Sequence, residues 1–130
     1  MQKDFDDWNN KKKNIHTEGS VGEIFFRTKE VWWCALGLNI GFEQDGKGEN
    51  FRRPVLILKK FNQYVALAIP ITSKPKEGKY YVPCNLGDKI ARKAITSQIR
   101  LIDTKRLIDK LGVADNESFE SIKKAIKDYL

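Results

Sequence analysis

The chain has 130 residues, a mass of 15.0 kDa and a formal net charge of +7 at pH 7. A composition that is 41% hydrophobic and 32% charged is too apolar for a disordered chain, and it contains no apolar run near the roughly 18 residues that span a membrane. Two cysteines without a metal-binding spacing exclude both a disulfide framework and a cysteine zinc site.

Residues 1–29 are expected to form an N-terminal extension that is partly helical. Phe5, Trp8 and Ile15 can line one face of a short helix, with acidic residues before it and lysines after it, which suits the helix dipole. The first residues lack the apolar segment of a secretion signal, so we expect a cytoplasmic protein.

The centre of the chain is expected to form four or five short β-strands. Compact segments with apolar or aromatic side chains carry this prediction: 31–36, 54–58, 64–69, 79–82 and 94–102. Asn62-Gln63 predicts a turn between the second and third segments, which would then form an antiparallel hairpin. No helix-length segment separates the strands, which argues against parallel α/β units.

Two helices are expected to close the chain. Asp103 or Thr104 can cap a short one that ends at Gly112, and Asp115 or Asn116 can cap the last. The first would bury Leu107, Ile108 and Leu111. The last has apolar residues at helical spacing: Phe119, Ile122, Ala125, Ile126 and Tyr129. Strands followed by helices predict an α+β fold that is mainly β, a small, partly closed barrel with C-terminal helices packed on it.

The positive charge is concentrated in the second half of the chain. Residues 61–110 hold ten basic and four acidic residues, a net +6 of the total +7. A local surplus of this kind favours a polyanionic partner such as a nucleic acid. A solvated lysine-rich surface explains the same charge without a partner.

The polar residues 41–53, around the start of the second predicted strand, limit the kinds of ligand and reaction that the chain can be expected to support. Residues 41–47 match the start of a phosphate-binding P-loop, but Gly48 stands where a magnesium-binding Ser or Thr is needed, so nucleotide binding is not expected. The single histidine, His16, lies in the extension, away from any predicted triad or histidine pair. Arg52 and Arg53 can hold phosphate oxygens at the mouth of the strand, or can form surface salt bridges with acidic residues of the loop.

Six short segments follow one another in a recognisable order: 30–33, 41–44, 53–58, 68–73, 97–103 and 105–110. Together they resemble the MazF/PemK family, the endoribonuclease toxins (mRNA interferases) of type II toxin–antitoxin systems. The resemblance covers residues 30–130 and implies an SH3-like, plasmid-maintenance-toxin-like β-barrel that forms a homodimer. It further implies a cognate antitoxin protein as partner, and sequence-specific cleavage of single-stranded mRNA to 2′,3′-cyclic phosphate and 5′-hydroxyl ends, with no metal ion or other cofactor.

The resemblance also assigns roles to residues of this sequence. Arg53 and Thr72 correspond to the catalytic arginine and threonine of the family, and Glu43 to a glutamate implicated in some members. A carboxylate at this position is able to accept the proton of the ribose 2′-hydroxyl. The residues expected to contact RNA are Gln44, Lys47, Arg52, Ser73 and Gln98.

The sequence departs from the family pattern at three places. The loop between Glu43 and Arg53 is longer than usual, Phe42 replaces a small polar residue, and Lys29 stands where a glycine is frequent. Two other functions remain open at this point. The same barrel can serve as a non-catalytic RNA- or protein-binding module, and related barrels act on a topoisomerase.

Overall fold

The computed structural model describes residues 24–36 and 52–130. The helix predicted around Phe5 and Trp8 lies outside the described residues. Residues 24–29 contain a turn and no helix. Within the described ranges, none of the helices has the length and hydrophobicity that a membrane crossing demands.

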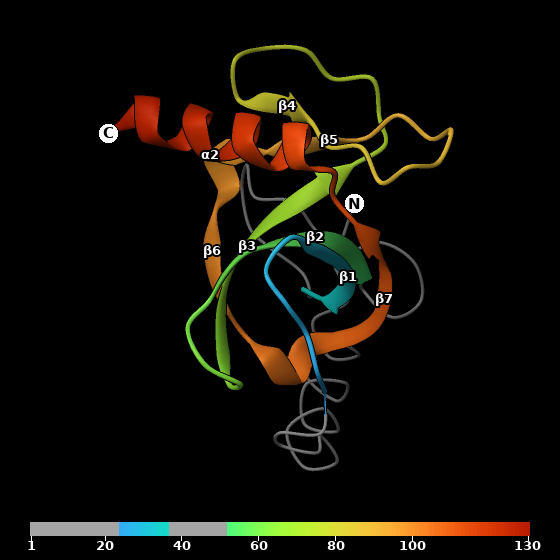
Figure 1. Ribbon diagram of the computed structural model, residues 1–130, viewed down its shortest axis with the longest axis vertical. Helices are drawn as coiled ribbons and strands as arrows, with labels where there is room; N and C mark the ends of the chain where they lie inside the picture. Colours follow the sequence, from blue (N-terminus) through green and yellow to red (C-terminus); the bar gives the residue numbers. More distant parts are fainter. Residues whose placement is uncertain (1–23, 37–51) are drawn as a thin grey trace, which may run out of the picture.

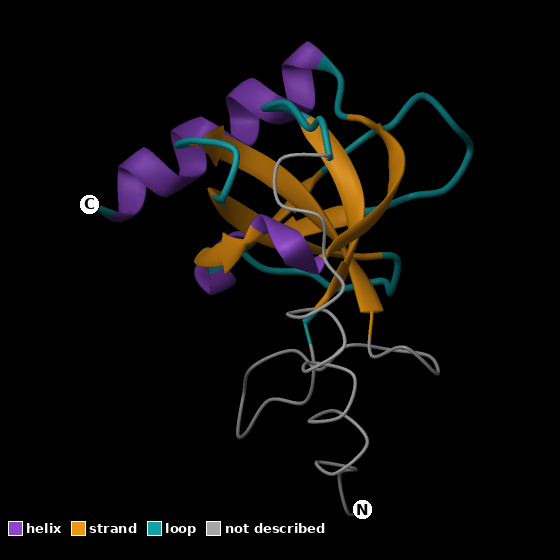
Figure 2. Cartoon of the chain, turned by 90° about the horizontal axis from the view of Figure 1, so that it is seen from below, coloured by secondary structure: helices purple, strands orange, loops and turns teal. Residues whose placement is uncertain are grey.

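Seven strands within these residues form one strongly curved sheet, in which every pairing is antiparallel. They are β1 (Glu30–Ala35), β2 (Arg52–Lys60), β3 (Val65–Thr72), β4 (Tyr81–Pro83), β5 (Lys93–Ile95), β6 (Arg100–Asp103) and β7 (Leu107–Val113). The order is β4-β5-β3-β2-β1-β7, and β6 pairs with β3. Figures 1 and 2 show the strands curving round one another, with helix α2 (Asn116–Tyr129) beside β4. The predicted mainly β fold with a C-terminal helix is thereby confirmed.

The predicted hairpin is present as β2 and β3, with Val55 opposite Pro70. Asn62 forms the turn, because its Oδ1 accepts hydrogen bonds from the backbone N–H groups of Tyr64 at 2.7 Å and Val65 at 3.0 Å. The beginning of β2 and the end of β3 therefore lie side by side, at the end of the hairpin opposite the turn.

The prediction of a single strand over 94–102 was wrong. A 3-10 turn, Thr96–Gln98, divides it into β5, which pairs with the end of β3, and β6, which pairs with the start of β3. The turn resets the alternation of side chains. Leu101 is consequently 61% exposed, while Ile102 is buried.

The first of the two predicted C-terminal helices was also wrong. Asp103 does act as a cap, since its side chain accepts a hydrogen bond from the Lys105 N–H at 2.9 Å, but it caps one 3-10 turn, Thr104–Arg106. The chain then continues as β7, where Leu107 lies opposite Cys34 and Gly112 opposite Val31. The open edge of β1 offers backbone hydrogen bonds along the whole segment, and this pairing outweighs the local helical pattern.

The last helix begins where it was predicted. Asp115 is its N-cap, and the carboxylate accepts a hydrogen bond from the Ser118 N–H at 2.7 Å. Phe119 and Ile122 are buried against the sheet.

The sheet buries apolar side chains on both faces, so the core has two parts. The cluster inside the barrel contains Trp32, Val55, Ile57, Ala68 and Ile102. The cluster beneath α2 contains Val31, Leu56, Ile69, Ile71 and Ile122. Neighbouring residues of β1 and of β2 alternate between the two clusters, as successive side chains of a strand must. Burial on both faces fixes the register of β2 and β3, which carry the candidate site.

Lys29, at the position where the resembling family often has glycine, has a φ of 79°. This left-handed conformation favours glycine, so a non-glycine residue here is strained. The surrounding bonds hold it. The Lys29 N–H donates to the Ile57 carbonyl at 2.9 Å, and the Lys29 carbonyl accepts from the Ala114 N–H at 2.9 Å. The Lys29 ammonium also donates to the Asn116 side chain at the start of α2.

Glu30 is a buried carboxylate with three partners. Its Oε1 accepts hydrogen bonds from the Arg27 N–H at 2.8 Å and from Trp32 Nε1 at 3.0 Å, and its Oε2 lies 3.0 Å from Lys110 Nζ. Burial alone would raise the pKa of Glu30, but the hydrogen bonds from Trp32, Lys110 and Arg27 outweigh it and lower the pKa.

We expect Glu30→Gln to reduce the free energy of unfolding at pH 7 by about 1 kcal/mol, since an amide oxygen is a weaker acceptor than a carboxylate. Because the folded-state pKa is lowered, the advantage of the wild type exists above the ordinary carboxyl pKa and is lost as pH falls through the lowered value. Urea unfolding at pH 7 and near pH 3 checks this. An equal difference at both pH values would contradict it.

Candidate functional site

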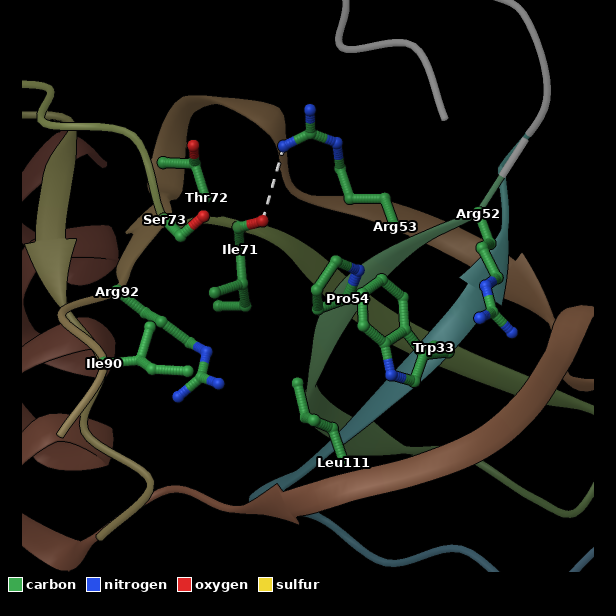
Figure 3. A pocket seen from close by; sticks show the side chains of 10 residues that line it. All are labelled: Trp33, Arg52, Arg53, Pro54, Ile71, Thr72, Ser73, Ile90, Arg92 and Leu111. Carbon is green, nitrogen blue, oxygen red and sulfur yellow. Dashed lines mark hydrogen bonds between the residues drawn. The ribbon is translucent and has the colours of Figure 1, made fainter. Parts of the chain in front are cut away.

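A cavity of about 460 Å³ opens where β2 begins and β3 ends. Its volume is in the range of small-ligand sites. Figure 3 shows three kinds of side chain around it. The cationic ones are Arg52, Arg53 and Arg92, and the hydroxyl-bearing ones are Thr72 and Ser73. The apolar ones are Trp33, Pro54, Ile71, Ile90 and Leu111.

Arg53 is a buried cation, with only 3% of the residue exposed. It lies in β2 opposite Cys34 of β1, and Pro54 follows it. Its Nη1 donates a hydrogen bond to the Ile71 carbonyl at 3.3 Å, which directs the guanidinium toward the end of β3 (Figure 3). Because a guanidinium stays protonated at any physiological pH, Arg53 presents a fixed positive charge at this edge.

Thr72 is the last residue of β3 and is likewise buried. Its Oγ1 accepts a hydrogen bond from the Lys74 N–H at 3.1 Å. An accepting hydroxyl keeps its own proton, so Thr72 is able to donate to an oxygen of a bound molecule. Ser73, the next residue, is exposed and adds a second hydroxyl at the rim.

An aromatic wall lies beside these polar groups. Trp33 is half-buried, and the Arg52 guanidinium lies over its ring, 5.1 Å from the centroid. This cation–π contact keeps the Arg52 guanidinium beside Trp33, apart from the Arg53 guanidinium (Figure 3). Fixed cations, hydroxyl donors and a half-buried aromatic ring are together suited to the phosphate and the base of a nucleotide.

The two thiols do not supply a nucleophile. Burial raises the pKa of Cys34 to about 12, and burial together with Asp115 raises the pKa of Cys84 to about 11. Both thiols are therefore protonated at neutral pH and pack as small apolar side chains. In the part of the chain that the structure describes, no three His, Cys, Asp or Glu side chains gather as they would around a metal ion.

The structure brings together four of the residues that the sequence proposed: Arg52, Arg53, Thr72 and Ser73. Gln98 does not line this cavity; it lies in a separate hollow formed by residues 97–101. Glu43, Gln44 and Lys47 lie outside the described residues.

Sequence reasoning missed the other six residues that line the cavity: Trp33, Pro54, Ile71, Ile90, Arg92 and Leu111. Trp33 was assigned only to an apolar strand. Arg92 belongs to none of the segments that carry the family resemblance, and its only signal was its share of the basic surplus of residues 61–110.

Residues 27–130 match the family model described as PemK-like, MazF-like toxin of type II toxin–antitoxin system. The crystal structure of MazF (Form-I) from Deinococcus radiodurans is similar with a TM-score of 0.69 and 18% identity, covering 82% of this chain and 97% of that one. Its MazE–MazF complex (Form-II) gives 0.64 and 16%, covering 82% and 96%. An endoribonuclease in complex with its cognate antitoxin, from Mycobacterial species, gives 0.63 and 17%, covering 80% and 93%. At these identities the likeness establishes the fold. No curated protein matches the chain.

Proposed function

The chain belongs to the family of PemK-like, MazF-like toxins of type II toxin–antitoxin systems, and within it we propose that the chain is a metal-independent, sequence-specific endoribonuclease acting on single-stranded mRNA. The observation that carries this proposal is the meeting of the Arg53 guanidinium and the Thr72 hydroxyl in one cavity. We assign the activity to a toxin domain of residues 30–130, preceded by an extension of residues 1–29.

In the proposed reaction the ribose 2′-oxygen attacks the adjacent phosphorus. A bond forms between the 2′-oxygen and phosphorus, and the bond from phosphorus to the 5′-oxygen breaks. The 2′-hydroxyl gives up its proton to a base and the leaving 5′-oxygen takes up a proton from water, so the products are a 2′,3′-cyclic phosphate and a 5′-hydroxyl. Negative charge grows on the phosphoryl oxygens as the new bond forms, and donors fixed in advance at that position lower the barrier.

Arg53 and Thr72 are suited to this charge. The guanidinium of Arg53 is buried and oriented by its bond to the Ile71 carbonyl, so it does not need to reorganise during the reaction. The Thr72 hydroxyl can donate to a phosphoryl oxygen while Lys74 holds it from the other side. Glu43 is the carboxylate that we assign as acceptor of the 2′-hydroxyl proton.

A cognate antitoxin and a second copy of the chain are the proposed protein partners. Relatives with the same fold support the first, since one is described in complex with its cognate antitoxin and another as a MazE–MazF complex. The homodimer rests on the family alone.

The test is incubation of the purified protein with an end-labelled pool of single-stranded RNA that covers all short sequences, in the presence of a chelator. We expect discrete fragments that carry 2′,3′-cyclic phosphate ends. Intact RNA after incubation with protein shown to be folded would reject the nuclease and favour a non-catalytic binding module on the same barrel.

Thr72→Val removes the hydroxyl and keeps the shape of the side chain. We expect cleavage to slow roughly 10- to 100-fold, because a hydrogen bond to a charged phosphoryl oxygen is lost. Thr72→Ser, which keeps the hydroxyl, is the matched control and is expected to retain most of the rate. Single-turnover cleavage of one target RNA measures both. Equal rates for the valine and serine variants would remove Thr72 from the mechanism.

A further inference from the structure

Arg92 is a second buried guanidinium in the same cavity. It lies in the loop that leads into β5, and only 7% of its side chain is exposed. Its neighbour Lys93 is the register partner of Thr72, so the backbone of this loop runs beside the end of β3. Figure 3 shows the Arg92 side chain extending into the cavity, across from Trp33 and Pro54.

Asp88 holds Arg92 in place. Both carboxylate oxygens of Asp88 accept hydrogen bonds from Arg92 Nη1, at 2.8 and 2.9 Å, and Oδ1 also accepts from the Ile90 N–H at 3.3 Å. The hydrogen bonds from Arg92 lower the pKa of Asp88, so the Asp88 carboxylate is charged at neutral pH. The side chain of Asp88 is 44% exposed, whereas that of Arg92 is almost enclosed.

This pairing is a poor device for stability. A salt bridge with one partially exposed member contributes little to folding, while enclosing a guanidinium costs desolvation. The arrangement instead fixes a cation at the wall of a cavity.

The pairing also leaves donors for a ligand. A guanidinium has five N–H groups on three nitrogens. Within the described residues, the side-chain hydrogen bonds of Arg92 start from Nη1, which leaves the donors on Nε and Nη2 to other acceptors. Arg53 reaches the cavity from β2 and Arg92 from the loop before β5, and such a pair of cations suits an anion with more than one charged group.

We propose that Arg92, positioned by Asp88, is a second phosphate contact of this site and binds a phosphodiester of single-stranded RNA next to the one that Arg53 holds. This inference rests on the proposed function and specifies its substrate. The site would then need two adjacent phosphodiesters, the one that is cleaved and one next to it. A cleavable RNA must therefore extend past the bond that breaks.

The experiment uses the double variant D88N/R92Q, which removes one charge of each sign and so keeps the net charge of the chain at +7. The probe is a pool of single-stranded RNA with 2′-O-methyl groups, which cannot be cleaved by 2′-hydroxyl attack. We expect affinity at low salt to fall roughly 10- to 100-fold. We also expect the slope of log affinity against log salt concentration to become shallower by about 0.7, the value for one phosphate contact on a single strand.

The matched control is E120Q/K123Q, which removes the exposed ion pair between Glu120 and Lys123 on α2 in the same charge-neutral way. Its affinity and salt slope are expected to equal those of the wild type. A second variant, Arg92→Lys, keeps the charge in the site. It is expected to keep the wild-type salt slope and to lose only part of the affinity, because an ammonium lacks the planar donor fork.

The outcomes separate this inference from the proposed function. If the wild type cleaves unmodified RNA and D88N/R92Q, shown to be folded by thermal unfolding, binds the probe with wild-type affinity and slope, Arg92 is no phosphate contact. If Arg92→Lys reduced the salt slope as much as D88N/R92Q does, the effect would not follow the charge at position 92. It would point to damage to the fold, and the proposed phosphate contact would be rejected. If the wild type neither binds nor cleaves RNA, the proposed function itself fails.

Discussion

Replacement of Arg53 by alanine is expected to lower the rate of RNA cleavage by about 10²–10³-fold while leaving the chain folded, because it removes a donor fixed where charge develops. The loss should appear in the rate of the chemical step, since the guanidinium is most useful to the phosphoryl oxygens when they carry the most charge. Single-turnover cleavage with enzyme in excess measures this step, and thermal unfolding reports on the fold.

The neighbouring Arg52 supplies the matched control for this prediction. Arg52→Ala removes the same charge one residue earlier in β2, but that guanidinium lies over the Trp33 ring. We expect Arg52→Ala to weaken RNA binding and to leave the chemical step nearly unchanged. Equal losses in the chemical step for both variants would mean that Arg53 acts only through general attraction of RNA.

Local patterns were enough to predict the hairpin that carries Arg53 and Thr72 of the candidate site. The hairpin of β2 and β3 joins neighbouring segments through a short turn centred on Asn62, so its register follows from nearby residues. That register places Arg53 and Thr72 side by side at the open end of the hairpin. The family resemblance named the same two residues, and the register of the hairpin gives the physical reason that they line one cavity.

The wrong prediction of a helix from Leu107 and the failure to predict Arg92 have a common cause, which is strand pairing between segments far apart in the sequence. The segment that begins at Leu107 has a capping residue, Asp103, and helical spacing, yet it forms β7 because β1 lies beside it with an unpaired edge. No local pattern reveals that edge. Arg92 was missed for the same reason, since only the pairing of β5 with β3 carries its loop to the cavity.

Replacement of Ile122 by alanine is expected to have the largest effect on stability. Ile122 lies on the face of α2 that packs on the sheet and is fully buried there, in the cluster that contains Leu56, Ile69 and Ile71. Loss of a buried isoleucine to alanine costs about 2–5 kcal/mol, from the lost transfer free energy and the cavity that remains. Urea unfolding at neutral pH measures the change.

The same substitution at Ile126, one helical turn later, is a control that distinguishes the effect of burial from that of helix propensity. Ile126→Ala makes the same chemical change in α2 at a half-buried position, so we expect a clearly smaller loss. Because alanine favours a helix more than isoleucine does at both positions, equal losses would show that the effect does not depend on how deeply the side chain is buried, and would contradict the prediction. The carbonyl of Ile71, which accepts the Arg53 hydrogen bond, belongs to a residue of this cluster. If α2 only secures the fold, Ile122→Ala protein that is still folded should cleave RNA at close to the wild-type rate, whereas Arg53→Ala protein that is still folded should cleave it far more slowly.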